Sequence, residues 1–213
     1  MNFVKRVMIC ALLTALTAGV AMAHPMGNFS INHYARIAAY QGRMELRYVI
    51  DMAEIPTVSE KSAIAAAGSD DKYLSTEAST LVKGLTLSID GRPASLVLDG
   101  SSLEFRPGAG GLQILRIDLR LHASGGPGVV DYRDDNFPGR TGWKEIVAPQ
   151  ASATGAGFLS TDPTDALMTY PAESLSTPPQ QVEAHIQFSA AASSTKAAAS
   201  TSGFGGNRQH AAA

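Results

Sequence analysis

The chain has 213 residues, of which 45% are apolar and 17% are charged, and its formal net charge is −2. This length favours a single domain, and the apolar fraction is sufficient to form a hydrophobic core. No basic block occurs beyond Lys5 and Arg6. The composition therefore argues against a nucleic-acid partner, because phosphate backbones are bound by clustered lysine and arginine.

The first 23 residues have the pattern of a secretory signal. Lys5 and Arg6 precede the apolar run VMICALLTALTAGVAM, and Ala-Met-Ala at 21–23 is a small-residue cleavage sequence. The run is short for a membrane-spanning helix, which needs about 20 apolar residues. We therefore expect cleavage after Ala23, a periplasmic or otherwise extracytoplasmic location, and no stable membrane insertion of the mature chain.

Two alternating segments follow the signal. Residues 30–40 place Ile31, Ala35 and Ile37 on one face, and residues 44–52 repeat the pattern after the turn sequence QGR. A period of two residues is typical of strands. These segments are expected to form a hairpin.

Two short helices are predicted next, at 58–67 and 71–83. Pro56 interrupts the strand pattern, and the following sequence is rich in alanine with apolar residues at helical spacing. Ser69 or Asp70 could cap the second helix and Gly84 could end it.

The remainder of the chain has mainly strand patterns. Asp90-Gly91 is a strong hairpin-turn signal. Residues 112–123 alternate throughout, with a leucine-rich face expected to point inward. Further strand candidates are VVDYRDD, GWKEIVAP and VEAHIQFSA, whereas 148–179 offers at most one helical turn.

These elements predict a mainly β fold, an antiparallel β-sandwich of immunoglobulin type with a short helical insertion at about 58–83. The domain is expected to span 24–189. The Ala/Ser/Gly-rich residues 190–213 are expected to be a disordered tail, because they contain too few apolar groups to offset the entropy of ordering.

Cleavage after Ala23 would make His24 the first residue of the mature protein. Its α-amine and imidazole Nδ1 can chelate one metal ion, and a third nitrogen would complete a site that suits Cu(II), or else Ni(II) or Co(II). Pro25 has no amide proton, so chelation through successive backbone nitrogens is excluded. The second histidine ligand would be His33, His122 or His185, and the sequence does not choose between them. The alternative is that His24 merely marks the cleavage point.

Other candidate groups give weaker predictions. The only cysteine, Cys10, lies in the signal, so the mature chain has no disulfide and no thiolate ligand. The acidic residues of DYRDDNFPGRTGW are expected to start turns and pair with Arg133 and Arg140 rather than bind calcium. Trp143 is expected to anchor the core.

Acid pairs, methionines and nucleophiles give no catalytic signature. Asp51 and Glu54 do not define an acid/base pair by their spacing. The scattered methionines 26, 44, 52 and 168 are expected in the core rather than on a metal. Established nucleophile, zinc and nucleotide motifs are missing from the sequence. We therefore expect no enzymatic activity.

Four longer motifs carry a family resemblance. The segments HPMGNFSINHYARI, YVIDMAEIPT, GLTLSIDGRP and YRDDNFPGRTGWKEIV resemble the extracytoplasmic N-terminal region of bacterial membrane proteins related to nickel/cobalt transporters. The resemblance covers roughly 24–188 and also includes LMTYPAESLSTPP. In that family, transmembrane helices follow this region, whereas an Ala/Ser tail follows here.

The resemblance implies a role in metal handling, with a membrane transporter as the partner, but it does not imply transport by this chain. An exported, non-catalytic metal-binding or metal-sensing domain is therefore the leading hypothesis. The second hypothesis is a structural or protein-interaction domain without a metal.

Overall fold

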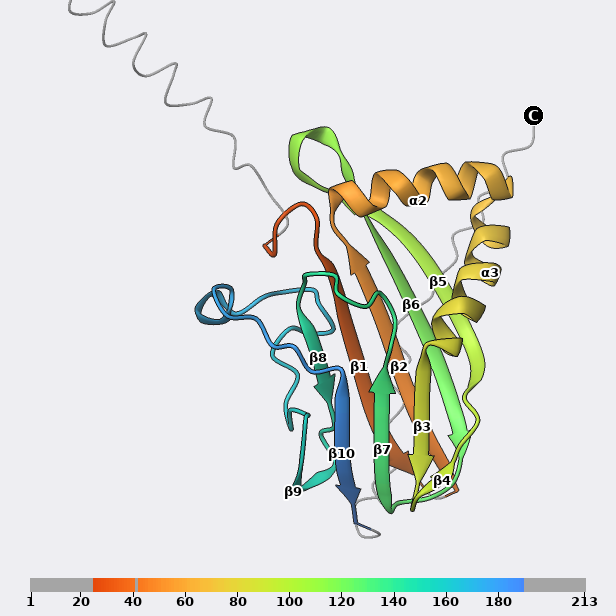
Figure 1. Cartoon of the computed structure of the whole chain (residues 1–213), viewed down its shortest axis with the longest axis vertical. Helices are drawn as coiled ribbons and strands as arrows, with labels where there is room; N and C mark the ends of the chain where they lie inside the picture. The colour runs from red at the N-terminus through yellow and green to blue at the C-terminus, as the bar shows by residue number, and fades with distance from the viewer. Residues whose placement is uncertain (1–24, 41, 190–213) are drawn as a thin grey trace, which may run out of the picture.

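The protein is described from a computed structural model, covering residues 25–40 and 42–189. Two five-stranded sheets form its framework, with strand orders β5-β6-β2-β1-β8 and β4-β3-β7-β10-β9 (Figure 1). The strands are β1 (Ile31–Tyr40), β2 (Arg43–Met52), β3 (Leu85–Ile89), β4 (Arg92–Pro93), β5 (Val97–Pro107), β6 (Gln113–Ser124), β7 (Val129–Asp134), β8 (Lys144–Val147), β9 (Ala151–Ala156) and β10 (Glu183–Phe188). The prediction of a strand-rich fold with two helices is confirmed.

The first sheet is mixed, which corrects the prediction of purely antiparallel pairing. The β1–β2 hairpin forms as predicted, with Ile31 opposite Met52, and β6 continues the antiparallel order. However, β8 pairs with β1 in parallel, with His33 opposite Lys144. Alternating patterns define which face of a strand is buried but not its direction relative to a distant partner.

The helices are α2 (Glu54–Ala67) and α3 (Asp70–Lys83). α2 begins four residues earlier than predicted. Pro56 lies in its first turn, where a backbone N–H has no intrahelical partner, so the proline removes no hydrogen bond. Ser69 caps α3 as predicted, because its hydroxyl accepts a hydrogen bond from the Lys72 amide, and Gly84 follows the last turn.

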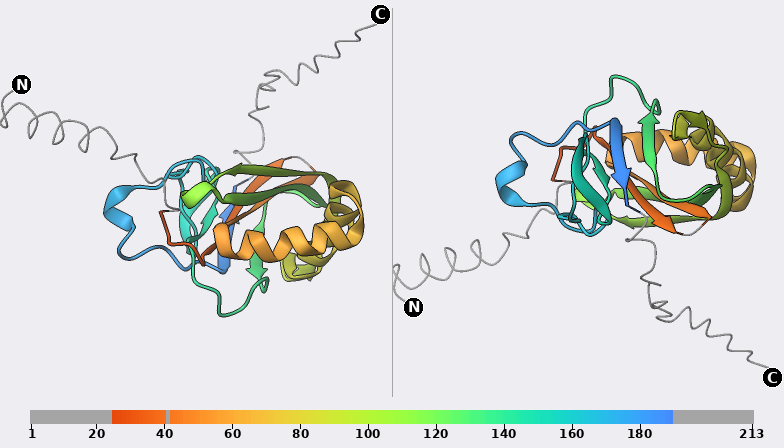
Figure 2. Two further views of the ribbon diagram at one scale, coloured as in Figure 1. Left: turned by 90° about the horizontal axis from the view of Figure 1, so that it is seen from above. Right: turned by 90° about the horizontal axis from the view of Figure 1, so that it is seen from below.

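One hydrophobic core fills the space between the sheets. The predicted inward face of β6, from Leu115 to Leu121, is buried, and so are Ile50 of β2 and Ile186 of β10. Both helices add apolar side chains to this core through Ile64 and Leu81. The helices therefore cover one side of the two sheets, as seen along the long axis in Figure 2.

A second, smaller cluster lies on the opposite side, where the segment 158–182 packs over the outer face of β1 and β2. Its buried members are Tyr34, Val49, Trp143, Val147, Ala166 and Leu167. Trp143 is only 2% exposed, so its predicted role as a core anchor is confirmed.

Several predictions fall outside or at the edge of the described structure. The signal at 1–23, His24 and the tail at 190–213 lie outside the described residues. Within the described residues, no helix combines the length and apolar character needed to cross a bilayer.

The Asp90-Gly91 turn is confirmed, with φ values of 50° and 72° that are typical of a tight hairpin turn.

Candidate functional site

The three predicted histidine ligands within the described residues lie on three different surfaces. His33 on β1 points between the sheets and is 2% exposed. His122 lies on the outer face of β6, and His185 lies on the outer face of β10 in the other sheet. The structure therefore does not bring these imidazoles together, and each one would have to pair separately with His24.

His33 belongs to a buried polar network that links the two sheets. Its Nδ1 lies 2.7 Å from Asp134 Oδ2 on β7, and the Tyr48 hydroxyl on β2 donates to the same oxygen at 2.9 Å. Asn136 donates through Nδ2 to the Tyr48 oxygen and to the Leu81 carbonyl. Burial raises the pKa of Tyr48 well above its usual value, so this hydroxyl remains a donor. The network explains His33 as a structural residue.

The other two histidines each have an aspartate on Nδ1. His122 Nδ1 lies 2.8 Å from Asp99 Oδ1, and His185 Nδ1 lies 2.7 Å from Asp131 Oδ1. An aspartate on Nδ1 leaves Nε2 as the nitrogen that can accept a ligand. Among the described residues, however, no three His, Cys, Asp or Glu side chains form a group able to hold a metal ion.

A pocket of about 620 Å³ lies where the described chain begins. Pro25 lines it, so the pocket adjoins the residue that would follow the mature N-terminus. The remaining lining comes from the end of β2, the start of α2, the β5–β6 hairpin and the 167–175 segment: Asp51, Glu54, Glu104, Arg106, Pro107, Gly108, Ile114, Leu167, Met168, Thr169, Tyr170 and Leu175. Three of these side chains are carboxylates.

Glu54 is the most unusual of the three carboxylates. It is the first residue of α2, two positions after the end of β2, and it is fully buried. Its Oε1 accepts a hydrogen bond of 2.6 Å from the Ala109 amide, whereas its Oε2 is buried and has no hydrogen-bond partner within residues 25–40 and 42–189. Gly108 makes this possible, because a Cβ there would lie 2.8 Å from Oε1. A buried carboxylate oxygen without a partner is costly unless a cation or donor binds it.

Asp51 and Glu104 already have positive partners. Asp51 lies 3.6 Å from the Arg116 guanidinium, whose other nitrogen donates to the Ala166 carbonyl at 2.6 Å. Burial lowers the pKa of Arg116. Glu104 accepts a 2.7 Å hydrogen bond from Arg106, which lowers the Glu104 pKa. Glu54 is therefore the carboxylate of this pocket without an arginine partner among the described residues.

Leu167, which lines the pocket, is the last residue of a strained turn. Asp165, Ala166 and Leu167 have φ values of 49°, 55° and 65°, a left-handed conformation that costs roughly 1–2 kcal/mol per non-glycine residue. Buried Glu145 holds this turn, because it accepts hydrogen bonds from the Trp143 indole and the Thr164 hydroxyl. Such strain is concentrated at functional sites.

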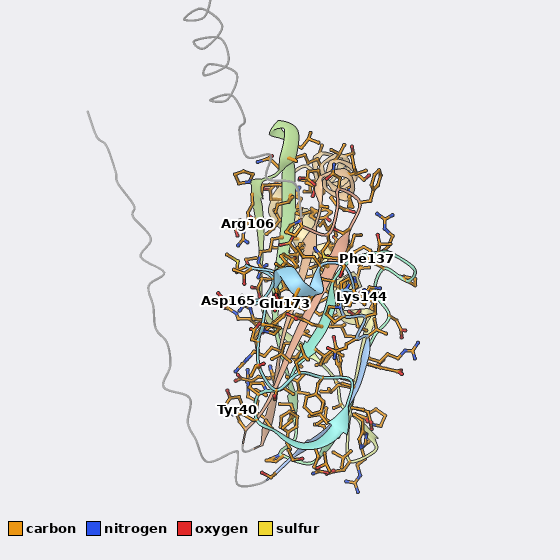
Figure 3. The ribbon with its side chains drawn as sticks, turned by 90° about the vertical axis from the view of Figure 1, so that its left-hand side faces the viewer. Tyr40, Arg106, Phe137, Lys144, Asp165 and Glu173 are labelled. Carbon is orange, nitrogen blue, oxygen red and sulfur yellow. The ribbon has the colours of Figure 1, made fainter. Side chains whose placement is uncertain are left out.

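Figure 3 shows Arg106 and Asp165 on one side of the molecule, with Phe137 and Lys144 on the other.

This pocket could be predicted from the sequence only in part. The spacing of Asp51 and Glu54 in the sequence does not define an acid pair, and it does not show that both side chains are buried in the pocket that Pro25 lines. Met44 and Met52 are in the core as predicted, but Met168 is 52% exposed, so its assignment to the core is wrong.

The acidic loop after β7 is explained by local pairing. Arg133 pairs with Asp135 as predicted, at 2.8 Å. Arg140 instead donates to the Phe29 carbonyl, so its predicted pairing with an acid is wrong. Asp131 and Asp134 bind His185 and His33 respectively, which the sequence did not reveal.

Comparisons with protein-family models, with curated proteins and with solved structures found no significant match. The resemblance to nickel/cobalt transporter-related proteins therefore stays a prediction.

Proposed function

We propose that this protein is an exported, non-catalytic domain that binds a transition metal outside the cytoplasmic membrane, as a sensor or as an accessory module of a membrane metal transporter. The metal would be Cu(II), Ni(II) or Co(II). The observation that supports this function is the carboxylate-lined pocket at Pro25, one peptide bond from His24. We also propose that the two-sheet framework is an immunoglobulin-like sandwich.

The proposed ligands are the His24 α-amine, the His24 imidazole Nδ1 and Glu54 Oε2. Consecutive Cα atoms are about 3.8 Å apart, so leader removal produces two metal-binding nitrogens beside Pro25. Glu54 takes the place of the second histidine, because His33 is enclosed between the sheets and His122 and His185 lie on outer faces of different sheets. Mixed nitrogen and carboxylate ligands suit these divalent metals.

Charge balance favours Glu54 over its acidic neighbours. Asp51 and Glu104 each have an arginine partner, whereas Glu54 Oε2 has neither an arginine nor a hydrogen-bond donor among the described residues. A bound divalent cation would offset the cost of burying that charge. Metal binding at this point would also fix the N-terminal segment against α2.

Calorimetric titration of Cu(II) and Ni(II) tests the proposal. The mature protein starting at His24 is compared with the same protein carrying one alanine before His24. The extra residue moves the amine away from the imidazole, so affinity should fall by orders of magnitude. Equal affinity in the two forms would contradict the chelate.

Two carboxylate variants separate the pocket from the surface. Glu54→Gln removes the proposed third ligand and should weaken binding by about 10-fold or more. Glu104→Gln removes a carboxylate of the same pocket that already pairs with Arg106, and should change affinity little. If no form binds metal, the protein is better explained as a structural or protein-interaction domain.

A further inference from the structure

Exposed apolar side chains gather at one end of the molecule. Among the residues that the structure describes, seven large apolar side chains are exposed, and four of them, Phe29, Ile55, Val58 and Leu112, lie at the end where β1 begins and β2 ends. The register brings them together, because Ile31 pairs with Met52 and Met52 with Leu115. Figure 1 shows the start of α2 and the β5–β6 hairpin at this upper end. We call these four residues the apolar tip.

Backbone contacts join the segments that carry the tip. The Ile55 amide donates to the Asn28 carbonyl at 3.0 Å, and the Ala53 amide donates to the Ser30 carbonyl at 2.9 Å. Phe29, with 65% of its surface exposed, lies between those two acceptors in the chain. These two backbone hydrogen bonds therefore hold Phe29 in its exposed position.

Two cations flank the apolar tip. Lys61 lies one turn after Val58 and donates to Gln113, the neighbour of Leu112. Arg140 donates to the Phe29 carbonyl at 3.4 Å. Within the described part of the chain, neither cation forms an ion pair with a carboxylate. The nearby Glu60 carboxylate accepts the Tyr73 hydroxyl.

We propose that the apolar tip binds the surface of an anionic lipid bilayer. Apolar side chains surrounded by lysine and arginine are the combination that inserts at the headgroup boundary while the cations contact lipid phosphates. The association is peripheral and reversible, and it rests on observations independent of the metal site.

Vesicle flotation tests the proposal with the mature protein from His24. It should float with phosphatidylglycerol-containing vesicles and much less with pure phosphatidylcholine, and 0.5 M salt should weaken binding. Phe29→Ser combined with Ile55→Ser and Val58→Ser should lower the vesicle partition coefficient about 10-fold or more. Lys61→Glu with Arg140→Glu should lower it selectively for anionic vesicles.

The chain supplies a matched control at its other end. Val97 and Leu98 are exposed at the start of β5, and their replacement by serine should leave vesicle binding unchanged. Failure of the mature protein to float, or equal loss in the Val97/Leu98 variant, would overturn the proposal. Binding that requires a purified membrane protein in the vesicle would reassign the tip to a protein interface. Glu54→Gln should float normally, so failure of the metal proposal leaves this result intact.

Discussion

Removal of the Asp134 carboxylate should destabilise the protein more than any surface substitution. Asp134 is 7% exposed and accepts three hydrogen bonds: from His33 at 2.7 Å, from Tyr48 at 2.9 Å, and from the Asn136 amide at 2.9 Å. These contacts connect β1 and β2 in one sheet with β7 in the other. Asp134→Ala removes the acceptor from two buried contacts, with His33 and Tyr48, and from one partly buried contact, with the Asn136 amide.

The magnitude follows from those unpartnered groups. Each buried donor left unsatisfied costs about 1–3 kcal/mol, so the loss of two buried contacts and one partly buried contact amounts to about 3–5 kcal/mol. We expect Asp134→Ala to lose about 3–5 kcal/mol of unfolding free energy, against a typical total of about 5–15 kcal/mol. Asp134→Asn keeps one acceptor oxygen and should lose about 1–3 kcal/mol.

Urea denaturation followed by circular dichroism measures these losses. Asp135→Ala is the matched control, because Asp135 is the next residue but its side chain is 53% exposed and pairs only with exposed Arg133; no measurable change is expected. A loss below about 1 kcal/mol for Asp134→Ala would show that the network does not hold the sheets together.

Three further outcomes are expected. Gly142→Ala should cost about 2 kcal/mol or more in urea denaturation, because φ is 152° and a Cβ would overlap the Ile31 carbonyl, whereas Gly139→Ala, in open space, should cost less. Burial raises the pKa of Glu145 in the folded protein, which favours the protonated carboxyl. The contribution of Glu145 to the unfolding free energy is therefore fully present below the pKa of the unfolded chain, about 4.3, and is lost as the pH rises through the pKa of the folded protein. The stability of the wild type relative to Glu145→Gln should therefore fall from pH 4 upward; a constant difference would refute this. Adding Cu(II) or Ni(II) at 100 times its Kd should raise the unfolding free energy by about 2.7 kcal/mol. In thermal denaturation, a chelator should abolish this stabilisation. The protein carrying alanine before His24 should not be stabilised by the same metal concentration.

Local patterns predicted most of the strands, because burial on one face imposes alternation on the sequence. The β1–β2 hairpin, the inward face of β6 and the cap at Ser69 follow from residues close together in the chain. The parallel pairing of β8 with β1 joins residues more than 100 positions apart, so no local sequence pattern predicts this pairing.

The candidate site was less predictable for the same reason. His24 and Glu54 could each be noted in the sequence, but the pocket that Pro25 and Glu54 line also needs Gly108 of the β5–β6 connection and Leu167 at the end of the turn at 165–167. His33 shows the converse case. A histidine in a strand could be a ligand or a core residue, and Asp134, from a distant strand, makes it a core residue.

Electron paramagnetic resonance of the Cu(II)-loaded mature protein tests the proposed site most directly. With ¹⁵N-labelled histidine, the spectrum should show two equatorial nitrogens, both from the single residue His24, and Glu54→Gln should alter the equatorial field without removing either nitrogen. Coupling to the imidazoles of two or more different histidines, or an unchanged spectrum when alanine precedes His24, would contradict a site built from the N-terminal residue and Glu54.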